Sequence, residues 1–527
     1  MTELATPAIL FCMKSTINHL WLMLQAWIDK TAMYMIVLYM LSILAVCSVM
    51  AGALNLVGVP ALSQISALLA VLITGYLTSV LAAKVRGITA NHHSSIITAL
   101  ILFFLIMPDL SVRGMEVLIG TVAFAVVSKY VFVYRGQHLM NPAALAIFFL
   151  GLTGYGFAMW WVATVWLFVP LVITGAIVVT KVRKWVPVIS FLLAGVIMSS
   201  VQSGLTGVTD TWYAFFVSSP ALFLGFFMLT EPFTIPPTKR LQAWYGVLVG
   251  VLSNTALVNP ILAVFSTSLT MTPELALLFG NLVFYPSTLR RKLFLTLQSK
   301  SEIAANTWEF IFTKPKNVVF QAGQYVEWML PHVPADIRGI RRYFTIAASP
   351  TEDTIRVALK LLNPGSSYKA ALAALPLGKT VIASQRAGDF ILPTDTSKKI
   401  AMIAGGIGVT PFRSQVKYLM DTKAATDTIL FYCANTKADL AYGDIWQQAS
   451  TQLPFKLVPI LAKETASSDY EIGFLTADIL KRRTPDFFER TWYVSGPPPM
   501  VNATVKTLQT LGVPKQQIVQ DFFPGLA

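Results

Sequence analysis

Two patterns of hydrophobic and polar residues divide this chain of 527 residues near residue 290. Before that position, long apolar stretches are separated by short polar segments, as in proteins that cross a membrane several times. After it, charged residues occur throughout and the apolar segments are short, which is typical of soluble α/β domains. The sequence therefore predicts an N-terminal membrane domain followed by soluble domains.

The membrane part holds about ten apolar stretches. They lie near residues 33–57, 62–83, 93–108, 114–131, 139–153, 158–180, 185–204, 213–230, 242–267 and 273–289. Several are shorter than the roughly 20 residues of a full crossing, and such stretches are typical of broken helices around a central site. We expect an all-α bundle of about ten transmembrane helices over residues 33–289, preceded by an amphipathic segment over residues 1–32.

Basic residues are concentrated in alternate loops between these stretches. They include Lys84 and Arg86, Lys129 and Arg135, Lys181 and Lys184, Lys239 and Arg240, and Arg290 and Lys292. The positive-inside rule then places both termini and the soluble domains in the cytoplasm. The stretch 99–108 is similar to 221–232, and 140–147 is similar to 271–278, which predicts two inverted five-helix repeats.

The composition argues against several classes of binding site. Charged residues make up 13% of the chain, about half of the roughly 25% found in soluble domains. The net charge of +14 lies largely in the loops, and no basic patch with interleaved aromatic residues indicates nucleic-acid binding. Cys12, Cys47 and Cys433 are too far apart for a cluster motif, and no histidine lies in mid-stretch to ligate haem, so no metal site is expected.

Two segments of the membrane part resemble known membrane subunits. RGQHLMNPAALAIFF (135–149) and FMLTEPFTIPPTKRLQAWYGVLVGVL (227–252) resemble the Rnf D and Nqr B subunits, flavin-carrying subunits of redox-driven ion pumps. The resemblance implies a ten-helix bundle of two inverted repeats near flavin chemistry, in the lipid bilayer of a bacterial inner membrane. The family's covalent-FMN motif is absent from the loop at 151–157, and only Thr209 in SGLTGVT offers an alternative attachment point. A second flavin, FMN or riboflavin, is therefore expected to be non-covalent.

The region over about residues 303–395 alternates apolar and polar positions between turns, which predicts a six-stranded antiparallel β-barrel after a linker at 290–302. In the strand that contains RRYFT, Arg342 and Phe344 share one face and Thr345 points to the other. A guanidinium suits phosphate, and an aromatic ring suits a flat ring system. Downstream, Gly365, Ser366 and Ser367 stand at a predicted helix start, which favours an anion.

Residues 396–527 alternate strands and helices, which predicts an α/β domain with a parallel sheet and a ligand at the carboxyl ends of its strands. Gly405, Gly406 and Gly408 follow the first strand and precede a helical segment, so a phosphate-bearing ligand would meet the helix N-terminus. Taken alone, this stretch also fits an ordinary glycine-rich turn.

The RRYFT strand, the NPGSS turn and the GGIGVTP stretch together closely resemble the ferredoxin–NADP⁺ reductase-type flavoprotein module, from about residue 303 onward. The resemblance implies FAD and NAD(P)H sites, with hydride transfer from nicotinamide to flavin. Thr345 beside the flavin and Ser495 beside the nicotinamide would be the catalytic residues. The cofactor-binding residues would be Gln324, Tyr325, Arg342, Tyr343, Phe344, Thr345, Gly365, Ser366, Ser367, Gly405, Gly406, Gly408, Thr410, Gly496 and Pro497.

Within this set, the resemblance implies that Arg342 binds the FAD pyrophosphate and that Phe344 packs on the flavin or its ribityl chain. The family commonly has Tyr at Phe344, Cys at Ser495 and an aromatic residue at Leu526. The segment ANTKAD (434–439) lacks the Arg that commonly binds a 2′-phosphate, which favours NADH, although Lys437 could replace that Arg.

The sequence thus predicts a membrane-bound FAD-dependent NAD(P)H oxidoreductase. It would pass electrons from NAD(P)H through FAD to a membrane-domain flavin, a quinone or a separate redox protein. Three alternatives remain at this stage: a redox-driven ion pump, a small-solute or flavin transporter with a regulatory reductase domain, and a soluble reductase tethered by its helices. Buried carboxylates that would mark an ion path are scarce, and Glu231 alone stands at the end of an apolar stretch.

Overall fold

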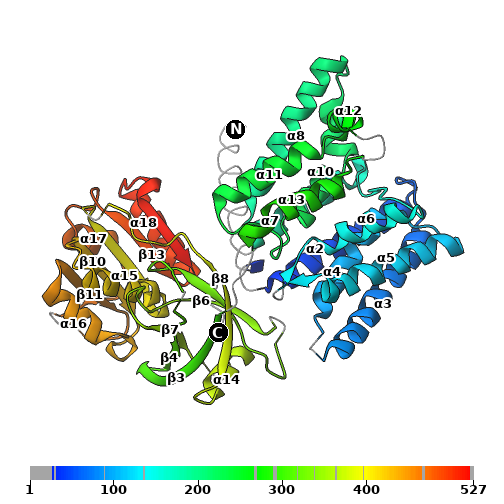
Figure 1. Ribbon diagram of the computed structural model, residues 1–527. Helices are drawn as coiled ribbons and strands as arrows, with labels where there is room; N and C mark the ends of the chain where they lie inside the picture. Colours follow the sequence, from blue (N-terminus) through cyan, green and yellow to red (C-terminus); the bar gives the residue numbers. More distant parts are fainter. Residues whose placement is uncertain are drawn as a thin grey trace, which may run out of the picture. The chain divides into compact units, whose positions relative to one another are not determined.

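A computed structural model describes residues 27–522, except 29–30, 88–89, 135–136, 266–269, 289–292, 317, 337–338, 363–364, 396 and 466–468. The chain divides into two compact units, Met1–Arg290 and Arg291–Ala527 (Figure 1). We call them the N-terminal and the C-terminal unit. The predicted amphipathic segment at 1–32 lies almost entirely outside the described residues, as does Leu526.

The N-terminal unit is helical, and each of the ten apolar stretches contains at least one helix. Its single helices are α2 Met33–Ala53, α3 Ala61–Arg86, α4 His92–Leu105, α5 Val112–Val131, α6 Pro142–Thr153, α7 Val165–Val182, α8 Trp185–Thr206, α11 Lys239–Leu252, α12 Thr255–Phe265 and α13 Pro273–Thr288. Between α8 and α11, short helices α9 Thr211–Tyr213 and α10 Ala221–Phe223 each continue into a π-helical segment.

Among the described residues, five helices are long and apolar enough to cross a membrane, namely α2, α3, α5, α7 and α8. Two bent pairs, with bends of 52° at residues 211–228 and 75° at residues 239–264, would raise the number to seven. The prediction of ten crossings is therefore not supported. Helices α4 and α6 have 14 and 12 residues, too few at about 1.5 Å per residue for a hydrocarbon core about 30 Å thick.

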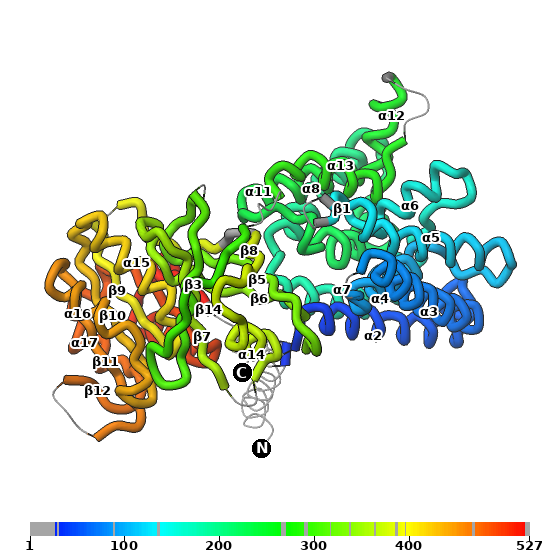
Figure 2. Tube along the Cα trace, turned by 60° about the horizontal axis from the view of Figure 1, so that its bottom comes forward, coloured from blue at the N-terminus to red at the C-terminus, as the bar shows by residue number. Residues whose placement is uncertain are grey.

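The outer surface of α3 is compatible with insertion into a membrane. This helix lies at the outside of its unit in both views (Figures 1 and 2). Its exposed residues include Leu62, Ile65, Leu69, Ile73, Leu77 and Leu81. An apolar surface of this kind is rare on soluble monomers.

Inside the N-terminal unit, polar side chains on separate helices form one hydrogen-bonded chain. Asn141 caps α6 by accepting from the Ala143 and Ala144 N–H groups at 3.1 Å. Its own N–H donates to Asn281 Oδ1 at 2.9 Å, and Asn281 Nδ2 donates to the Tyr245 hydroxyl at 2.7 Å. These hydrogen bonds connect the start of α6 with α13 and α11.

The C-terminal unit begins with six antiparallel strands. They are β3 Leu293–Ala304, β4 Thr307–Thr313, β5 Tyr325–Met329, β6 Arg341–Thr345, β7 Thr354–Lys360 and β8 Thr380–Ala387, in the order β6-β5-β8-β3-β4-β7. The predicted linker at 290–302 is wrong from Leu293 onward, because β3 pairs first with β8 and then with β4. The Ala347 N–H donates to the Arg356 carbonyl at 2.9 Å, but no β6–β7 pairing closes a barrel within the described strands.

The second half of this unit is a parallel sheet. Its strands are β9 Ile400–Gly405, β10 Thr428–Ala434, β11 Phe455–Leu461, β12 Glu471–Ile472, β13 Thr491–Gly496 and β14 Ile518–Phe522, in the order β12-β11-β10-β9-β13-β14. Its helices are α15 Thr410–Asp421, α16 Gly443–Gln452, α17 Ala477–Arg483 and α18 Pro498–Thr510.

The central strand β9 is fully buried because helices cover both faces of this sheet (Figures 1 and 2). Met402 and Ala404 pack in a core with residues of α15 and α16, whereas Ala401 and Ile403 pack in a second core with residues of α17 and α18. Alternate side chains of one strand thus enter two cores, as in doubly covered parallel sheets. The carboxyl end of β9 is the position where such folds bind their ligands.

Buried ionic contacts connect the two halves of the C-terminal unit. Arg413 of α15, which is 3% exposed, makes a bidentate ion pair with Glu352 and donates to the Ala347 carbonyl at 3.1 Å. The neighbouring Ser414 hydroxyl donates to the Ala348 carbonyl at 2.6 Å. The start of α15 is therefore held at a fixed position against the segment that follows β6.

Candidate active site

The strand β6 carries the predicted flavin-binding residues. In its pairing with β5, Thr345 stands opposite Tyr325 and Arg342 opposite Trp328. Thr345 is 3% exposed, and its hydroxyl is buried without a hydrogen-bond partner. An unsatisfied buried hydroxyl costs about 1–3 kcal/mol, so it marks a position where a ligand's polar atom fits.

The aromatic residues around Thr345 lie on different faces. Tyr325 and Tyr343 meet at right angles with 5.7 Å between ring centroids, and Tyr343 is 49% exposed. Phe344 instead packs against the core of the antiparallel sheet, with its ring 5.8 Å from the ring of Tyr368. The exposed ring on this strand is thus that of Tyr343, and the predicted contact of Phe344 with a flavin stays a prediction.

Gln324 stabilises the turn that leads into β5. Its side-chain carbonyl accepts from the Gln321 N–H at 3.0 Å, and its main-chain carbonyl accepts from the Ile346 N–H at 2.9 Å. This turn fixes the start of β5 against the end of β6, and the supporting role of Gln324 at a flavin site stays a prediction.

Arg342 lies close to the start of helix α14 Ser367–Ala374. Its guanidinium forms an ion pair with Asp336 at 2.7 Å and lies 5.3 Å from the ring centroid of Tyr368. Asp336 also donates its main-chain N–H to the Ser367 hydroxyl at 2.9 Å. The structure thus brings Arg342 close to Ser367 and Tyr368 through Asp336, and the phosphate subsite stays a prediction.

Three residues of this cluster were not found from the sequence. Asp336 and His332 lie in a loop without a recognisable pattern, and Tyr368 is a fully buried residue of α14 whose hydroxyl has no partner. Burial raises the pKa of this Tyr368 hydroxyl, so it stays protonated. In the sequence, the only signal for Tyr368 as a site residue is its position directly after Ser367.

The glycine turn after β9 lies against the end of β13. A Cβ at Gly408 would lie 2.6 Å from Gly496 Cα and from the Ser495 carbonyl oxygen, so no side chain fits there. Gly406 has a φ of +51° and open space within 4 Å of a Cβ position. The turn therefore packs closely on one side and leaves space on the other, beside the N-terminus of α15.

Ser495 and Thr410 flank this turn. Ser495 is fully buried, and its hydroxyl has no hydrogen-bond partner. Thr410, the first residue of α15, donates its hydroxyl to the Ile407 carbonyl at 3.2 Å. Gly496 and Pro497 follow Ser495, and Pro497 precedes α18. Both residues predicted to be catalytic, Thr345 and Ser495, thus carry buried hydroxyls that lack a partner.

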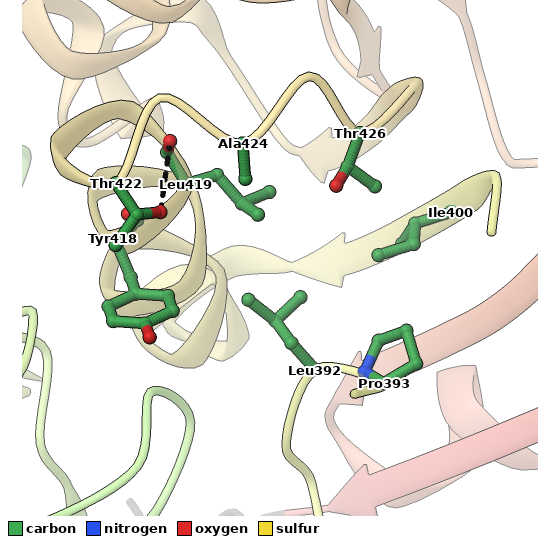
Figure 3. Close-up of a pocket in the computed structure, with 8 residues that line it drawn as sticks. All are labelled: Leu392, Pro393, Ile400, Tyr418, Leu419, Thr422, Ala424 and Thr426. Carbon is green, nitrogen blue, oxygen red and sulfur yellow. Dashed lines mark hydrogen bonds between the residues drawn. The ribbon is translucent and has the colours of Figure 1, made fainter. Parts of the chain in front are cut away.

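A separate groove lies at the opposite end of the parallel sheet (Figure 3). It is lined by Leu392, Pro393, Ile400, Tyr418, Leu419, Thr422, Ala424 and Thr426. Ile400 is the first residue of β9, so the groove is at the amino end of the strands. The Thr422 hydroxyl donates to the Tyr418 carbonyl at 2.7 Å, and the lining offers no charged group for a phosphate.

Other reactive groups are few in the part of the chain that the structure describes. Burial raises the pKa of the Cys433 thiol to about 12, which disfavours the reactive thiolate. Within those residues no group of three or more His, Cys, Asp or Glu side chains could hold a metal ion.

Comparison with known proteins agrees with this geometry. Residues 402–506 match the family described as "Oxidoreductase NAD-binding domain". This match and the curated relatives support the predicted FAD- and NAD-binding module of the ferredoxin–NADP⁺ reductase type in the C-terminal unit. A flavohemoprotein of Xylella fastidiosa is 27% identical over 209 residues, which are 39% of this chain and 51% of the relative. The chain thus spans about half the length of the first curated relatives that it matches.

Two further relatives are named as reductases. The glycine betaine monooxygenase reductase subunit of Chromohalobacter salexigens is 26% identical over 40% of this chain and 59% of its own length. NADH-cytochrome b5 reductase 1 of Ajellomyces capsulatus is 25% identical over 42% of this chain and 75% of its own length. Among solved structures, the Amycolatopsis cytochrome P450 reductase GcoB has a TM-score of 0.41 and 24% identity, over 45% of this chain and 71% of its own.

Proposed function

We propose that this protein is a membrane-bound, FAD-dependent NAD(P)H oxidoreductase that passes electrons to an acceptor in or at the membrane. The observation that carries the proposal is the arrangement on β6, where the buried, unpartnered Thr345 hydroxyl follows Arg342 by three residues. The relatives support the reaction class, because flavin and nicotinamide chemistry is common to reductase components of this type.

The residues present fit FAD. Arg342 and the N-terminus of α14, with Gly365 and Ser366, would hold the pyrophosphate through charge-assisted hydrogen bonds. The Thr345 hydroxyl would bond a polar edge of the ring system, with Tyr325 and Tyr343 on the same face. When bound, the flavin supplies the redox step, since it accepts a hydride and releases electrons singly.

The residues at the carboxyl end of the parallel sheet fit a nicotinamide nucleotide. The open side of Gly406 and the start of α15 would accept the pyrophosphate, and Ser495, Gly496 and Pro497 would border the nicotinamide. The protein's contribution is to orient the nicotinamide and to exclude water from it. The Ser495 hydroxyl, which is free to donate or accept, would fix its carboxamide.

We expect the protein to use NADH rather than NADPH. Carboxylates accept hydrogen bonds from the donors in the segment after β10, where a 2′-phosphate would bind. The Lys437 N–H donates to Glu464 Oε1 at 2.9 Å. Asp439 accepts from Lys360 Nζ at 2.8 Å and from the Thr436 hydroxyl at 2.9 Å. The Asp439 charge is paired with that of Lys360, so the Glu464 carboxylate is the group that would repel a 2′-phosphate here. In the variant Glu464→Gln, kcat/KM for NADPH should rise several-fold while that for NADH stays unchanged; equal changes for both would reject this role.

The acceptor would be a non-covalent flavin (FMN or riboflavin) in the N-terminal unit, a quinone or a redox protein. The apolar helices of that unit support a location in a lipid bilayer, which we expect to be a bacterial inner membrane with the reductase module on the cytoplasmic side.

The flavin content of the detergent-purified full chain tests the proposal. One FAD per chain and flavin reduction by NADH are expected, and a second flavin would identify the N-terminal unit as an electron carrier. The variant Arg342→Ala should weaken FAD binding by roughly 100-fold, the worth of about 3 kcal/mol in charge-assisted bonds. The matched variant Arg482→Ala, at a site 60% exposed, should retain FAD. Full-length protein that binds no flavin would refute the proposal.

A further inference from the structure

The loop before β6 is attached to the start of α14 through the Ser367 hydroxyl. His332 Nδ1 lies 2.8 Å from the Leu330 carbonyl and His332 Nε2 lies 2.9 Å from Ser367 Oγ. A carbonyl only accepts, so Nδ1 carries the proton, and in that tautomer Nε2 accepts the Ser367 hydroxyl proton. Ser367 Oγ also accepts from the Asp336 N–H at 2.9 Å. The hydroxyl therefore fixes the backbone of Asp336 at the predicted phosphate subsite.

The Asp336 carboxylate binds the same guanidinium that we assign to the flavin phosphate. Its two oxygens accept from Arg342 Nη2 at 2.7 and 2.8 Å. Arg342 Nη1 donates to the carbonyls of Gly339 and Arg341 at 2.8 and 2.7 Å. Both terminal nitrogens thus have acceptors from their own loop, and the Arg342 side chain is only 13% exposed.

Carboxylate and phosphate oxygens use the same geometry on an arginine fork, so they compete for it. The geometry points to Asp336 as a competing anion. We propose that the pyrophosphate of FAD binds Arg342 by displacing the Asp336 carboxylate, so that Asp336 lowers flavin affinity and keeps the flavin exchangeable. This inference rests on the proposed function, because it concerns the same phosphate subsite.

The structure also predicts where the displaced carboxylate stays. The bond from the Asp336 N–H to Ser367 does not involve the carboxylate, so the residue remains beside the subsite after displacement. Its negative charge then continues to oppose that of the pyrophosphate, and the effect of Asp336 on flavin affinity is both competitive and electrostatic.

The test uses the flavin-free full chain in detergent and measures the FAD dissociation constant by flavin fluorescence. The variant Asp336→Asn should bind FAD about fivefold to tenfold more tightly, because an isosteric amide competes less well for the guanidinium. Inorganic pyrophosphate should compete with FAD at lower concentrations in this variant than in the wild type. Asp336→Glu retains the charge and should stay close to the wild type.

Asp486→Asn is the matched control. Asp486 is also paired with an arginine and has 24% side-chain exposure, against 23% for Asp336. Asp486 lies beside Arg490 before β13 and outside the phosphate subsite. The FAD dissociation constant of Asp486→Asn should therefore equal that of the wild type. Thermal unfolding of each flavin-free variant checks that the variant is folded. If Asp336→Asn is not folded, the FAD affinity of Asp336→Glu still shows whether the carboxylate charge matters.

The outcomes separate this inference from the proposed function. If the wild type binds FAD and Asp336→Asn binds it equally or more weakly, Asp336 is a structural residue and the inference is rejected. If neither protein binds FAD, the proposed function fails and this inference fails with it. Tighter FAD binding and stronger pyrophosphate competition, confined to Asp336→Asn, support a competing anion.

Discussion

In the N-terminal unit the interior polar side chains of Asn141, Asn281 and Tyr245 bond to neutral partners, whereas in the C-terminal unit buried polar groups join ion pairs such as Glu352–Arg413. An ion pair must offset the cost of removing two charges from water, and few positions inside an apolar bundle allow this. Neutral amides satisfy backbone and side-chain groups at lower cost. This difference holds for these side chains and not for every position, because the N-terminal unit also partly buries Lys129 and Glu231, whose charges interact.

Backbones approach closely in both units: a Cβ at Gly250 of α11 would lie 2.6 Å from the Phe191 carbonyl oxygen of α8, as close as the contact at Gly408. The largest expected effect is on the glycine contact of the C-terminal unit. In Gly408→Ala the new Cβ would lie 2.6 Å from backbone atoms of Ser495 and Gly496, which we expect to destabilise this unit by about 3 kcal/mol. Thermal unfolding should show the loss, and hydrogen exchange should locate it at β9 and β13.

Gly443→Ala is the control for this variant, because a Cβ at Gly443 meets no atom within 4 Å. It should leave the unfolding temperature of the C-terminal unit unchanged. Equal effects of both alanine variants would mean that the Gly408 contact does not limit stability.

The ion pair between the two halves of the C-terminal unit has the next largest effect. Burial raises the pKa of Glu352, but the hydrogen bond and charge of Arg413 outweigh it and lower that pKa overall. Glu352→Gln leaves Arg413, which is 3% exposed, with an uncompensated charge, and should cost about 2–3 kcal/mol. Glu489→Gln, at a pair whose carboxylate is 65% exposed, should cost less than about 0.5 kcal/mol in the same denaturant titration.

The neutral hydrogen bonds that connect Asn141, Asn281 and Tyr245 in the N-terminal unit should contribute less to the free energy of unfolding than that ion pair. Asn141 is 2% exposed and caps α6, so Asn141→Ala should cost about 1–2 kcal/mol for a cap and its interhelical bonds. Asn91→Ala removes an exposed cap of α4 and should cost about half as much. The unfolding temperature in detergent measures both. A larger loss at Asn91 would contradict the role of Asn141 in connecting helices.

The smallest effect is the pH dependence of the partly buried pair between Asp486 and Arg490. Hydrogen bonds from Arg490 lower the pKa of Asp486 to about 2. Because this pKa is lower in the folded state than the roughly 3.9 of an unfolded Asp, the contribution is complete above about pH 4 and is lost as the pH falls toward 2. We expect less than about 1 kcal/mol, because Asp427 also pairs with Arg490 at 2.9 Å and stays in place when Asp486 is protonated. Asp486→Asn should remove this part of the acid sensitivity, measured as the denaturant midpoint against pH.

The sequence by itself determined the two-part organisation, the alternating strands and helices of the parallel sheet, and the residues on β6 and in the glycine turn. These features follow from local patterns. Apolar stretches of sufficient length form helices, and Ile400–Gly405 reads as a buried strand because helices must cover both of its faces.

The short stretches at 93–108 and 139–153 are already visible in the sequence. Only the tertiary structure decided how many of the other stretches cross, because bends of 52° and 75° do not show in the length of an apolar stretch. It also decided that β3 starts within the predicted linker, since pairing with β8 and β4 depends on distant strands. The contacts of Arg413 with Glu352 and of Asp336 with Arg342 depend on loop geometry and on residues far apart in the chain. Such contacts form only when folding brings the partners together, so no local pattern in the sequence could reveal them.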